Sequence, residues 1–287
     1  MRGSLGRALS VGLGAVALTI AGFFSQAPAR SQVQDPSPDS LTTSALGNYL
    51  AGRFARTAQD TKDAAEFYGR ALERDPSNEV LLEQAFQMET MSGNWPNAVP
   101  LAEKLASTRE SHRMSQFLLG VTAFKSAAYP KAENHFKAAA ENPIGELTSA
   151  IALGWTRLAA GDTDGALKAV DLPKQPDWAQ FYLRYHRALM ADIAGRKAIA
   201  NATYEKMFRQ DSRTLRTALA YAQHAAHYGD FKLAKQIMRE QLSKTQGDPH
   251  PLAKEMLERI NKREKTELLI ATPSEGLAEL FYGLGEA

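Results

Sequence analysis

The stretch ALGWTRLAAGDTDGALKAV, residues 152–170, decides the fold. Apolar residues at helical spacing fill its first half, and Ala166, Leu167 and Val170 resume the pattern after the break AAGDTDGA. This arrangement predicts two short helices joined by a turn. A residue as small as alanine at the start of the second helix needs a physical reason, and equivalent positions elsewhere in the chain provide one.

Alanine recurs at intervals of 34 residues around Ala166, at Ala64, Ala98, Ala132, Ala200 and Ala234. Twelve residues before each alanine the residue is small in five of the six units, and Phe86 is the exception. Five residues before it lies a turn column: Gln59, Gly93, Ala127, Gly161, Gly195 and Gly229. Four residues after it the side chains are mostly large and apolar: Tyr68, Ala102, Phe136, Val170, Tyr204 and Met238. A fixed period of this length indicates an array of helical units.

The columns have a common physical explanation. Small residues are expected where the two helices of a unit cross most closely, because a larger side chain there would overpack the contact at a cost of about 1–3 kcal/mol. Glycine in the turn column can end the first helix in the left-handed conformation. The next residue, which is Asp60, Asn94, Asp162 or Asp230 in four units, can cap the second helix. Stacked units then bury each other's apolar faces.

These residues resemble the tetratricopeptide repeat family, most clearly in FLLGVTAFKSAAYPKAENHFKAAAENP (117–143) and ALGWTRLAAGDTDGAL (152–167). The resemblance implies an all-α fold, an α-solenoid of about six 34-residue helix-turn-helix repeats covering residues 45–248. The expected units are 45–78, 79–112, 113–146, 147–180, 181–214 and 215–248. Pro173 and Pro176 are expected to shorten the second helix of the fourth unit.

The register fails after the sixth unit. Residues 249–270 become charged and amphipathic, which favours a capping helix that shields the last apolar face of the solenoid. Residues 271–287 begin a further helix, and LFYGLG (280–285) resembles the opening of another repeat. Two interpretations stand side by side here: the sequence is part of a longer or truncated repeat protein, or a short terminal helix packs back on the array.

The N-terminus has the layout of a secretory signal peptide over residues 1–29. Arg2 and Arg7 precede the uncharged run 8–24, and Ala27 and Ala29 frame a cleavage site. The alternative is an uncleaved membrane anchor. Residues 30–44 are predicted to form a flexible linker. The chain contains no cysteine, which suits an oxidising compartment, so we expect secretion across the inner membrane into the periplasm.

Charge and motifs argue against several classes of function. Without Arg2 and Arg7 the chain carries 32 basic and 32 acidic residues, which disfavours nucleic acid as a partner. The sequence contains no GxSxG elbow, P-loop or HExxH motif, so we expect no enzyme, cofactor or metal. His224 and His227 lie one helical turn apart near Asp230, but a zinc site needs more ligands than this stretch supplies.

In the tetratricopeptide family, the first helix of each unit lines a concave groove that binds partners. Carried over by position, the resemblance assigns to this groove Tyr49, Arg53, Arg56, Glu83, Gln87, Phe117, Val121, Lys125, Ile151, Trp155, Tyr182, Tyr185, Leu189, Leu219 and Gln223. Trp155 and Tyr185 are either anchors for a partner or part of the core. Arg53 and Arg56 either contact an acidic partner or form a solvated face. Tyr49 and Arg53 replace the Lys and Asn with which some family members clamp a terminal carboxylate.

These observations predict a secreted, non-catalytic scaffold of the bacterial cell envelope that binds a peptide or partner protein in its groove. The alternative is an N-terminal targeting and recruitment module of a longer envelope-assembly protein or enzyme. More sequence beyond Ala287 would discriminate between them, because further repeats favour the first and a catalytic domain the second.

Overall fold

The computed structural model describes residues 44–244 and 247–285, and within these ranges all regular structure is helical. The helices form six consecutive pairs, followed by α14 (Pro251–Asn261) and α15 (Pro273–Gly285). The pairs are α2 (Ala45–Thr57) with α3 (Thr61–Arg74), α4 (Glu79–Met91) with α5 (Trp95–Thr108), α6 (Arg113–Lys125) with α7 (Tyr129–Ala138), α8 (Asn142–Ala159) with α9 (Thr163–Ala169), α10 (Asp177–Ile193) with α11 (Lys197–Gln210), and α12 (Leu215–His227) with α13 (Phe231–Lys244). The predicted signal peptide lies outside the described residues, as does the linker up to residue 43.

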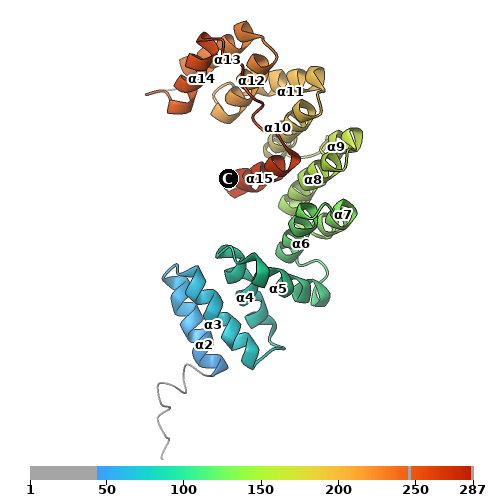
Figure 1. Ribbon diagram of the computed structural model, residues 1–287, viewed down its shortest axis with the longest axis vertical. Helices are drawn as coiled ribbons and strands as arrows, with labels where there is room; N and C mark the ends of the chain where they lie inside the picture. The colour runs from blue at the N-terminus through green and yellow to red at the C-terminus, as the bar shows by residue number, and fades with distance from the viewer. Residues whose placement is uncertain (1–43, 245–246, 286–287) are drawn as a thin grey trace, which may run out of the picture.

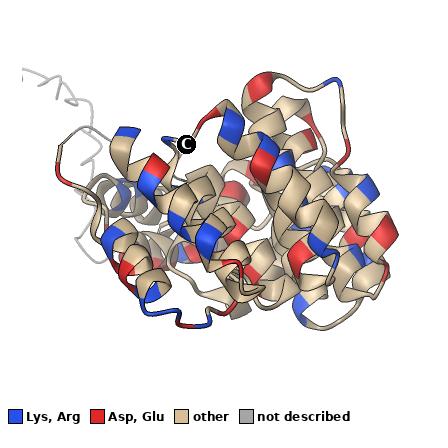
Figure 2. Ribbon diagram, turned by 90° about the horizontal axis from the view of Figure 1, so that it is seen from above, with Lys and Arg blue, Asp and Glu red and all other residues tan. Residues whose placement is uncertain are grey.

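From α2 to α14, each helix packs on its neighbours in sequence, so the pairs stack into an arc. Figure 1 shows α15 returning to the inner side of this arc, beside α8 and α10. Acidic and basic residues are interspersed along the helices (Figure 2). The predicted all-α solenoid of six helix-turn-helix units is confirmed.

The small and large columns meet inside the units. All six alanines of the 34-residue register are fully buried. A Cβ atom placed on Gly120 would lie 2.5 Å from Cε1 of Phe136, and one placed on Gly52 would lie 3.1 Å from the Tyr68 ring. The small residue of the first helix therefore makes room for the large residue of the second.

The second unit reverses this arrangement. Its first helix carries Phe86 where the other units have a small residue, and its second helix carries Ala102 where they have mostly large ones. Both side chains are fully buried in the same apolar cluster. Because the two exceptions occur in one unit, the summed volume at the crossing is retained.

The glycines of the turn column adopt the predicted left-handed conformation, and the two other residues of the column adopt it as well. Gly93, Gly161, Gly195 and Gly229 have φ angles between +68° and +87°, and Gln59 and Ala127 adopt the same conformation at +62° and +58°. Asp60, Asp162 and Asp230 accept hydrogen bonds from backbone N–H groups three residues later. Asn94 makes no such side-chain bond.

The fourth and last units depart from a regular array. Helix α9 has only 7 residues, in agreement with the shortening predicted from Pro173 and Pro176. The predicted capping helix 249–270 is shorter than expected, because α14 spans only Pro251–Asn261. Arg263 follows with a φ of +54°, and residues 264–272 form an extended connection that we call the strap. The strap leads to α15, which packs back on the array.

Candidate functional site

The residues assigned to the concave groove divide into a covered middle and a more open N-terminal end. In the middle, Ile151 and Trp155 are fully buried, and Tyr185, Leu189 and Phe117 are at most 9% exposed. Val121 and Tyr182 are half-buried. The cover over this region is largely α15, which packs mainly on α8 and also on α10. The structure thus brings the predicted anchors together, but beneath a segment of the same chain.

Helix α15 lies against the aromatic side chains of the groove. A Cβ atom on Gly276 would lie only 2.4 Å from the Trp155 indole, so the α15 backbone is seated directly on that ring. The Phe281 ring meets Phe117 edge-on, with ring centroids 6.0 Å apart. Leu277 and Leu280 are buried in the same cluster. Aromatic side chains that bind a helix make edge-on ring contacts and close packing of this kind.

One polar cluster sits among these apolar contacts. Oε1 of Glu279 accepts hydrogen bonds from Nη1 of Arg216 at 2.6 Å and from the Tyr185 hydroxyl at 3.0 Å. Burial, together with the Glu279 carboxylate, raises the pKa of Tyr185 well above its ordinary value, so the hydroxyl stays protonated and can donate. The Arg216 guanidinium also lies 5.0 Å from the Tyr282 ring centroid. Together these contacts fix the position of α15 along the groove.

The strap is attached to α12 by hydrogen bonds to its backbone and side chains. The Thr266 hydroxyl donates to the Gln223 carbonyl at 3.0 Å, and Nε2 of Gln223 donates to the Glu267 carbonyl at 2.7 Å. Nδ1 of His227 lies 2.8 Å from the Thr266 carbonyl. Gln223, which the repeat register assigns to the groove, therefore binds the strap through two hydrogen bonds.

A second layer of polar contacts supports Trp155 from below. Its Nε1 donates to Nδ1 of His186 at 3.1 Å, and both side chains are buried. Burial lowers the pKa of His186 to about 3, with a smaller contribution from the positive charge of Arg216. The imidazole is therefore neutral at physiological pH and can accept the indole N–H.

The first two units leave their groove residues more accessible. Tyr49 packs on Tyr68 with ring centroids 6.0 Å apart, and Arg53 is exposed with its guanidinium 5.9 Å from the Tyr49 ring. Arg56 donates to Gln84 at 2.6 Å.

Charged groups continue this open surface into the second unit. Glu83 pairs with Arg109 at 2.8 Å and accepts a hydrogen bond from Gln87 at 3.2 Å. The hydrogen bond from Arg109 lowers the pKa of Glu83 below its usual value. This end of the groove therefore presents charged groups of both signs, whereas α15 covers the aromatic middle.

At the junction with the third unit, the Lys125 ammonium lies 5.7 Å from the Trp95 ring centroid. In the sixth unit, Leu219 is half-buried near α14.

His224 and His227 both make contacts within the folded chain. His224 is buried, and its Nδ1 lies 2.5 Å from Oδ1 of the buried Asp192, whereas His227 contacts the strap. Within residues 44–244 and 247–285, no three His, Cys, Asp or Glu side chains form a group that could hold a metal ion.

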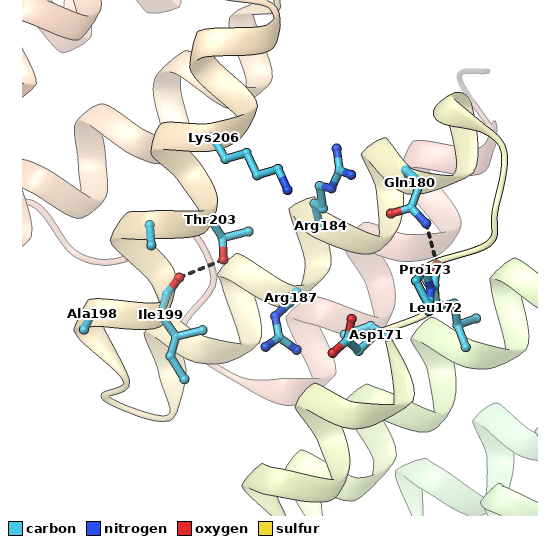
Figure 3. A pocket seen from close by; sticks show the side chains of 12 residues that line it. Asp171, Leu172, Pro173, Gln180, Arg184, Arg187, Ala198, Ile199, Thr203 and Lys206 are labelled. Carbon is cyan, nitrogen blue, oxygen red and sulfur yellow. Dashed lines mark hydrogen bonds between the residues drawn. The ribbon is translucent and has the colours of Figure 1, made fainter.

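A cleft of about 630 Å³ opens between the loop after α9 and helices α10 and α11 (Figure 3). It exists because α9 ends after 7 residues, which leaves unfilled the space that a full-length second helix would occupy. Arg184, Arg187 and Lys206 line it together with Asp171. Nη1 of Arg187 donates to the Leu167 carbonyl at 2.7 Å, so this guanidinium also ties α10 to α9. The shortened helix was predictable from its prolines, but the basic lining of the cleft was not.

The outer face of α2 is apolar and open. Leu50 and Phe54 are 53% and 79% exposed. Equivalent positions in later units are buried: Met88 lies one repeat after Phe54, and Leu118 lies two repeats after Leu50. Later units pack this face on the preceding unit. In the described residues, nothing occupies the corresponding place before α2.

None of the described helices has the length and apolar character needed to cross a membrane. This finding applies to residues 44–244 and 247–285, and the apolar run at 8–24 lies outside them.

The architecture and the repeat register define an α-solenoid of the tetratricopeptide type. Among solved structures, the chain is similar to a tetratricopeptide repeat protein from Parabacteroides merdae, with 18% identity and a TM-score of 0.51 over 79% of this chain and 87% of that one. The resemblance inferred from the 34-residue columns is thereby confirmed at the level of the fold.

Two further structures are similar at lower scores. A chain of the APC/C hetero-tetramer Cut9–Hcn1 matches with 11% identity and a TM-score of 0.47, covering 76% of this chain and 43% of that one. A chain of Naa15/Naa10 bound to HypK-THB matches with 16% identity and a TM-score of 0.49, covering 86% and 37%. No protein-family profile and no curated protein sequence matches the chain.

Proposed function

We propose that this protein is a non-catalytic scaffold of the bacterial cell envelope that binds a segment of a partner protein in its concave groove. The observation that carries the proposal is the seating of α15. The side chains that the repeat register assigns to partner contact, above all Trp155 and Tyr185, contact a helix and bury part of it. A surface that packs one amphipathic helix has the chemistry required to pack another.

Affinity in such a groove would come from the aromatic floor, and orientation from the polar groups. Trp155 and Phe117 offer apolar surface to a helix, while Arg216 and the Tyr185 hydroxyl recognise a carboxylate at one position along it. Interface energy is usually concentrated in a few aromatic and arginine side chains of this kind. The exposed Arg53 and Arg56 extend the surface toward an acidic portion of the partner.

Photo-crosslinking in living cells tests the binding face. A benzophenone amino acid at Arg53 should give discrete protein adducts, and the same probe at the exposed Lys62 on α3 serves as the matched control. Adducts of equal pattern and yield from both positions would reject the groove as the binding face.

The envelope location is supported by the layout of residues 1–29. Because the chain contains no cysteine, a Lys62→Cys variant carries a single thiol. A maleimide reagent that does not cross the inner membrane should label this thiol in intact cells with a permeabilised outer membrane. Labelling only after lysis would place the protein in the cytoplasm and contradict this part of the proposal.

A further inference from the structure

We propose that α15 is a resident, displaceable ligand of the groove, and that the physiological partner is an amphipathic helix that replaces it by presenting a small residue, two leucines and a carboxylate at the α15 spacing. This inference rests on the proposed function and names the kind of partner that it requires. Three properties of α15 support it: few buried residues and a low helix propensity, specific contacts with the groove, and an aromatic surface beneath it that its departure would expose.

Helix α15 is far less embedded than the helices beneath it. Only Gly276, Leu277 and Leu280 are buried among its 13 residues, whereas α8 buries 11 of 18 and α10 buries 9 of 17. Tyr282 is 56% exposed. A helix with so little buried surface can leave without unfolding the array, because few core contacts are lost.

The sequence of α15 also disfavours a helix standing alone. It contains Gly276, Gly283 and Gly285, and glycine is among the poorest helix formers. A helix of this length is marginal in water even with good helix formers, so α15 depends on its seat to remain helical. Only Gly276 is required by the seat, since a Cβ atom at Gly285 would meet no atom within 4 Å. A partner with alanine at the other two positions would form the same contacts from a more stable helix.

The contacts define what the partner must present. The position of Gly276 must remain small because it lies on the Trp155 ring. Leucines must follow one and four residues later, at the places of Leu277 and Leu280. A carboxylate must follow three residues later, where Glu279 meets Arg216 and Tyr185. The required pattern is therefore small–Leu–x–Glu–Leu on one helix.

Departure of α15 would leave this surface in need of a new cover. Trp155 would lose the backbone of Gly276 that now lies on it, and Phe117 would lose Phe281. Exposed contiguous apolar patches on proteins mark interaction sites, so the uncovered aromatic surface has the character of a binding site for a partner. The strap is held to α12 by hydrogen bonds, and its Ile270 is buried in the apolar cluster, so the strap can stay attached as a tether when α15 leaves.

The test uses the full chain and a fluorescent peptide of residues 272–285 in which Gly283 and Gly285 are alanine. In the Gly276→Leu chain the new side chain collides with Trp155 and should release the tethered helix, whereas Gly285→Leu adds the same side chain where it meets no atom. If α15 is docked in nine of ten wild-type molecules, its release should tighten peptide binding about tenfold, because the apparent Kd scales inversely with the open fraction. Gly285→Leu should bind like wild type, and a peptide with Glu279→Lys should lose binding to all three chains.

Hydrogen exchange on the same samples checks the release itself. Amides of α15 should lose protection in Gly276→Leu, while those of α3 to α5 stay as in wild type. A Glu279→Gln chain, which weakens only the polar cluster, should give an intermediate affinity and provides a milder variant should Gly276→Leu not fold. The proposal is overturned if α15 is released and the peptide still fails to bind, or if α15 exchanges only together with α8.

Light scattering measures the oligomeric state and so tests the alternative that a second copy of this chain occupies the groove. If Glu279→Gln, whose α15 still fits the seat, becomes a dimer, the groove takes the α15 of a second copy, and the partner-helix proposal is wrong. Failure of the proposed function is distinguishable, because crosslinking at Arg53 reports on cellular partners whether or not the α15 peptide binds in vitro.

Discussion

Gly120→Ala tests the principle on which each unit is built. The substitution adds one methyl group to α6, and its Cβ would lie 2.5 Å from Cε1 and 2.7 Å from Cδ1 of Phe136. Both residues are buried, and Phe136 belongs to the main apolar cluster, so its ring can retreat only by displacing other core side chains. Overpacking of this kind costs about 1–3 kcal/mol. Alanine also favours a helix over glycine by about 1 kcal/mol, so the net effect should be a destabilisation of up to about 2 kcal/mol.

Gly69 provides the matched control. It lies within α3, and a Cβ atom there would meet no atom within 4 Å. Gly69→Ala should therefore show only the gain in helix propensity, about 1 kcal/mol of stabilisation. The two substitutions are chemically identical, so the difference between them, about 1–3 kcal/mol, isolates the cost of crowding Phe136.

Urea unfolding followed by far-UV circular dichroism measures this difference as a shift in midpoint. Because repeat arrays need not unfold in one step, hydrogen exchange in α6 and α7 should accompany it. A further experiment introduces into the third unit the residue pair of the second unit, which has Phe86 in its first helix and Ala102 in its second. The double variant Gly120→Phe/Phe136→Ala should be more stable than either single variant. Equal stabilisation by Gly120→Ala and Gly69→Ala, or a double variant no more stable than the better of the two single variants, would refute the reasoning.

Three further predictions concern the pH response, the turns and a buried pair. Because the pKa of His186 is about 3 in the folded chain and 6.5 in the unfolded one, the unfolded state binds more protons as the pH falls, and this residue alone should lower stability from about pH 6.5 toward 3 by up to about 1.4 kcal/mol per unit; urea midpoints across pH should show a steeper slope for wild type than for His186→Gln, in which the slope from other groups such as His112 and Glu83 remains. Ala127→Gly should stabilise the chain by about 1 kcal/mol, because Ala127 holds a φ of +58°, whereas Gly161→Ala should destabilise it by a similar amount; thermal melts that move in the same direction for both would contradict this. Asp192→Ala leaves the buried His224 ring without its partner and should cost about 3 kcal/mol in urea unfolding, and Asp192→Asn, which retains an acceptor, should cost less.

The repeat architecture was predictable because its causes are local and periodic. Each unit repeats the same close crossing, so Gly120 and its equivalents recur at a constant interval beside the residues that fill the space. The turns follow from backbone conformation, which glycine adopts freely and which the register imposes even on Gln59 and Ala127. The shortening of α9 followed from the geometry of proline. Many equivalent copies make such signals visible in a single sequence.

The candidate site was predictable only in part. The register assigned Trp155 and Tyr185 to a groove for a partner, which stays a prediction, and it did not indicate that α15 would lie against both side chains. It also extended the predicted capping helix beyond Asn261, because the charged residues that follow have good helix propensity. Nothing periodic marks Arg263 as the residue where the chain leaves the helix.

Sequence alone thus determined the shape of each unit and the order of stacking, since those depend on neighbours at fixed separations along the chain. Only the tertiary structure decided what lies in the groove. The meeting of Glu279 with Arg216 and Tyr185, and of Gly276 with Trp155, joins segments far apart in sequence through a single contact surface. A contact surface that occurs only once in the fold leaves no repeated pattern in the sequence. Its stabilising contacts can therefore be recognised only in the folded array, where the strap brings α15 to the groove.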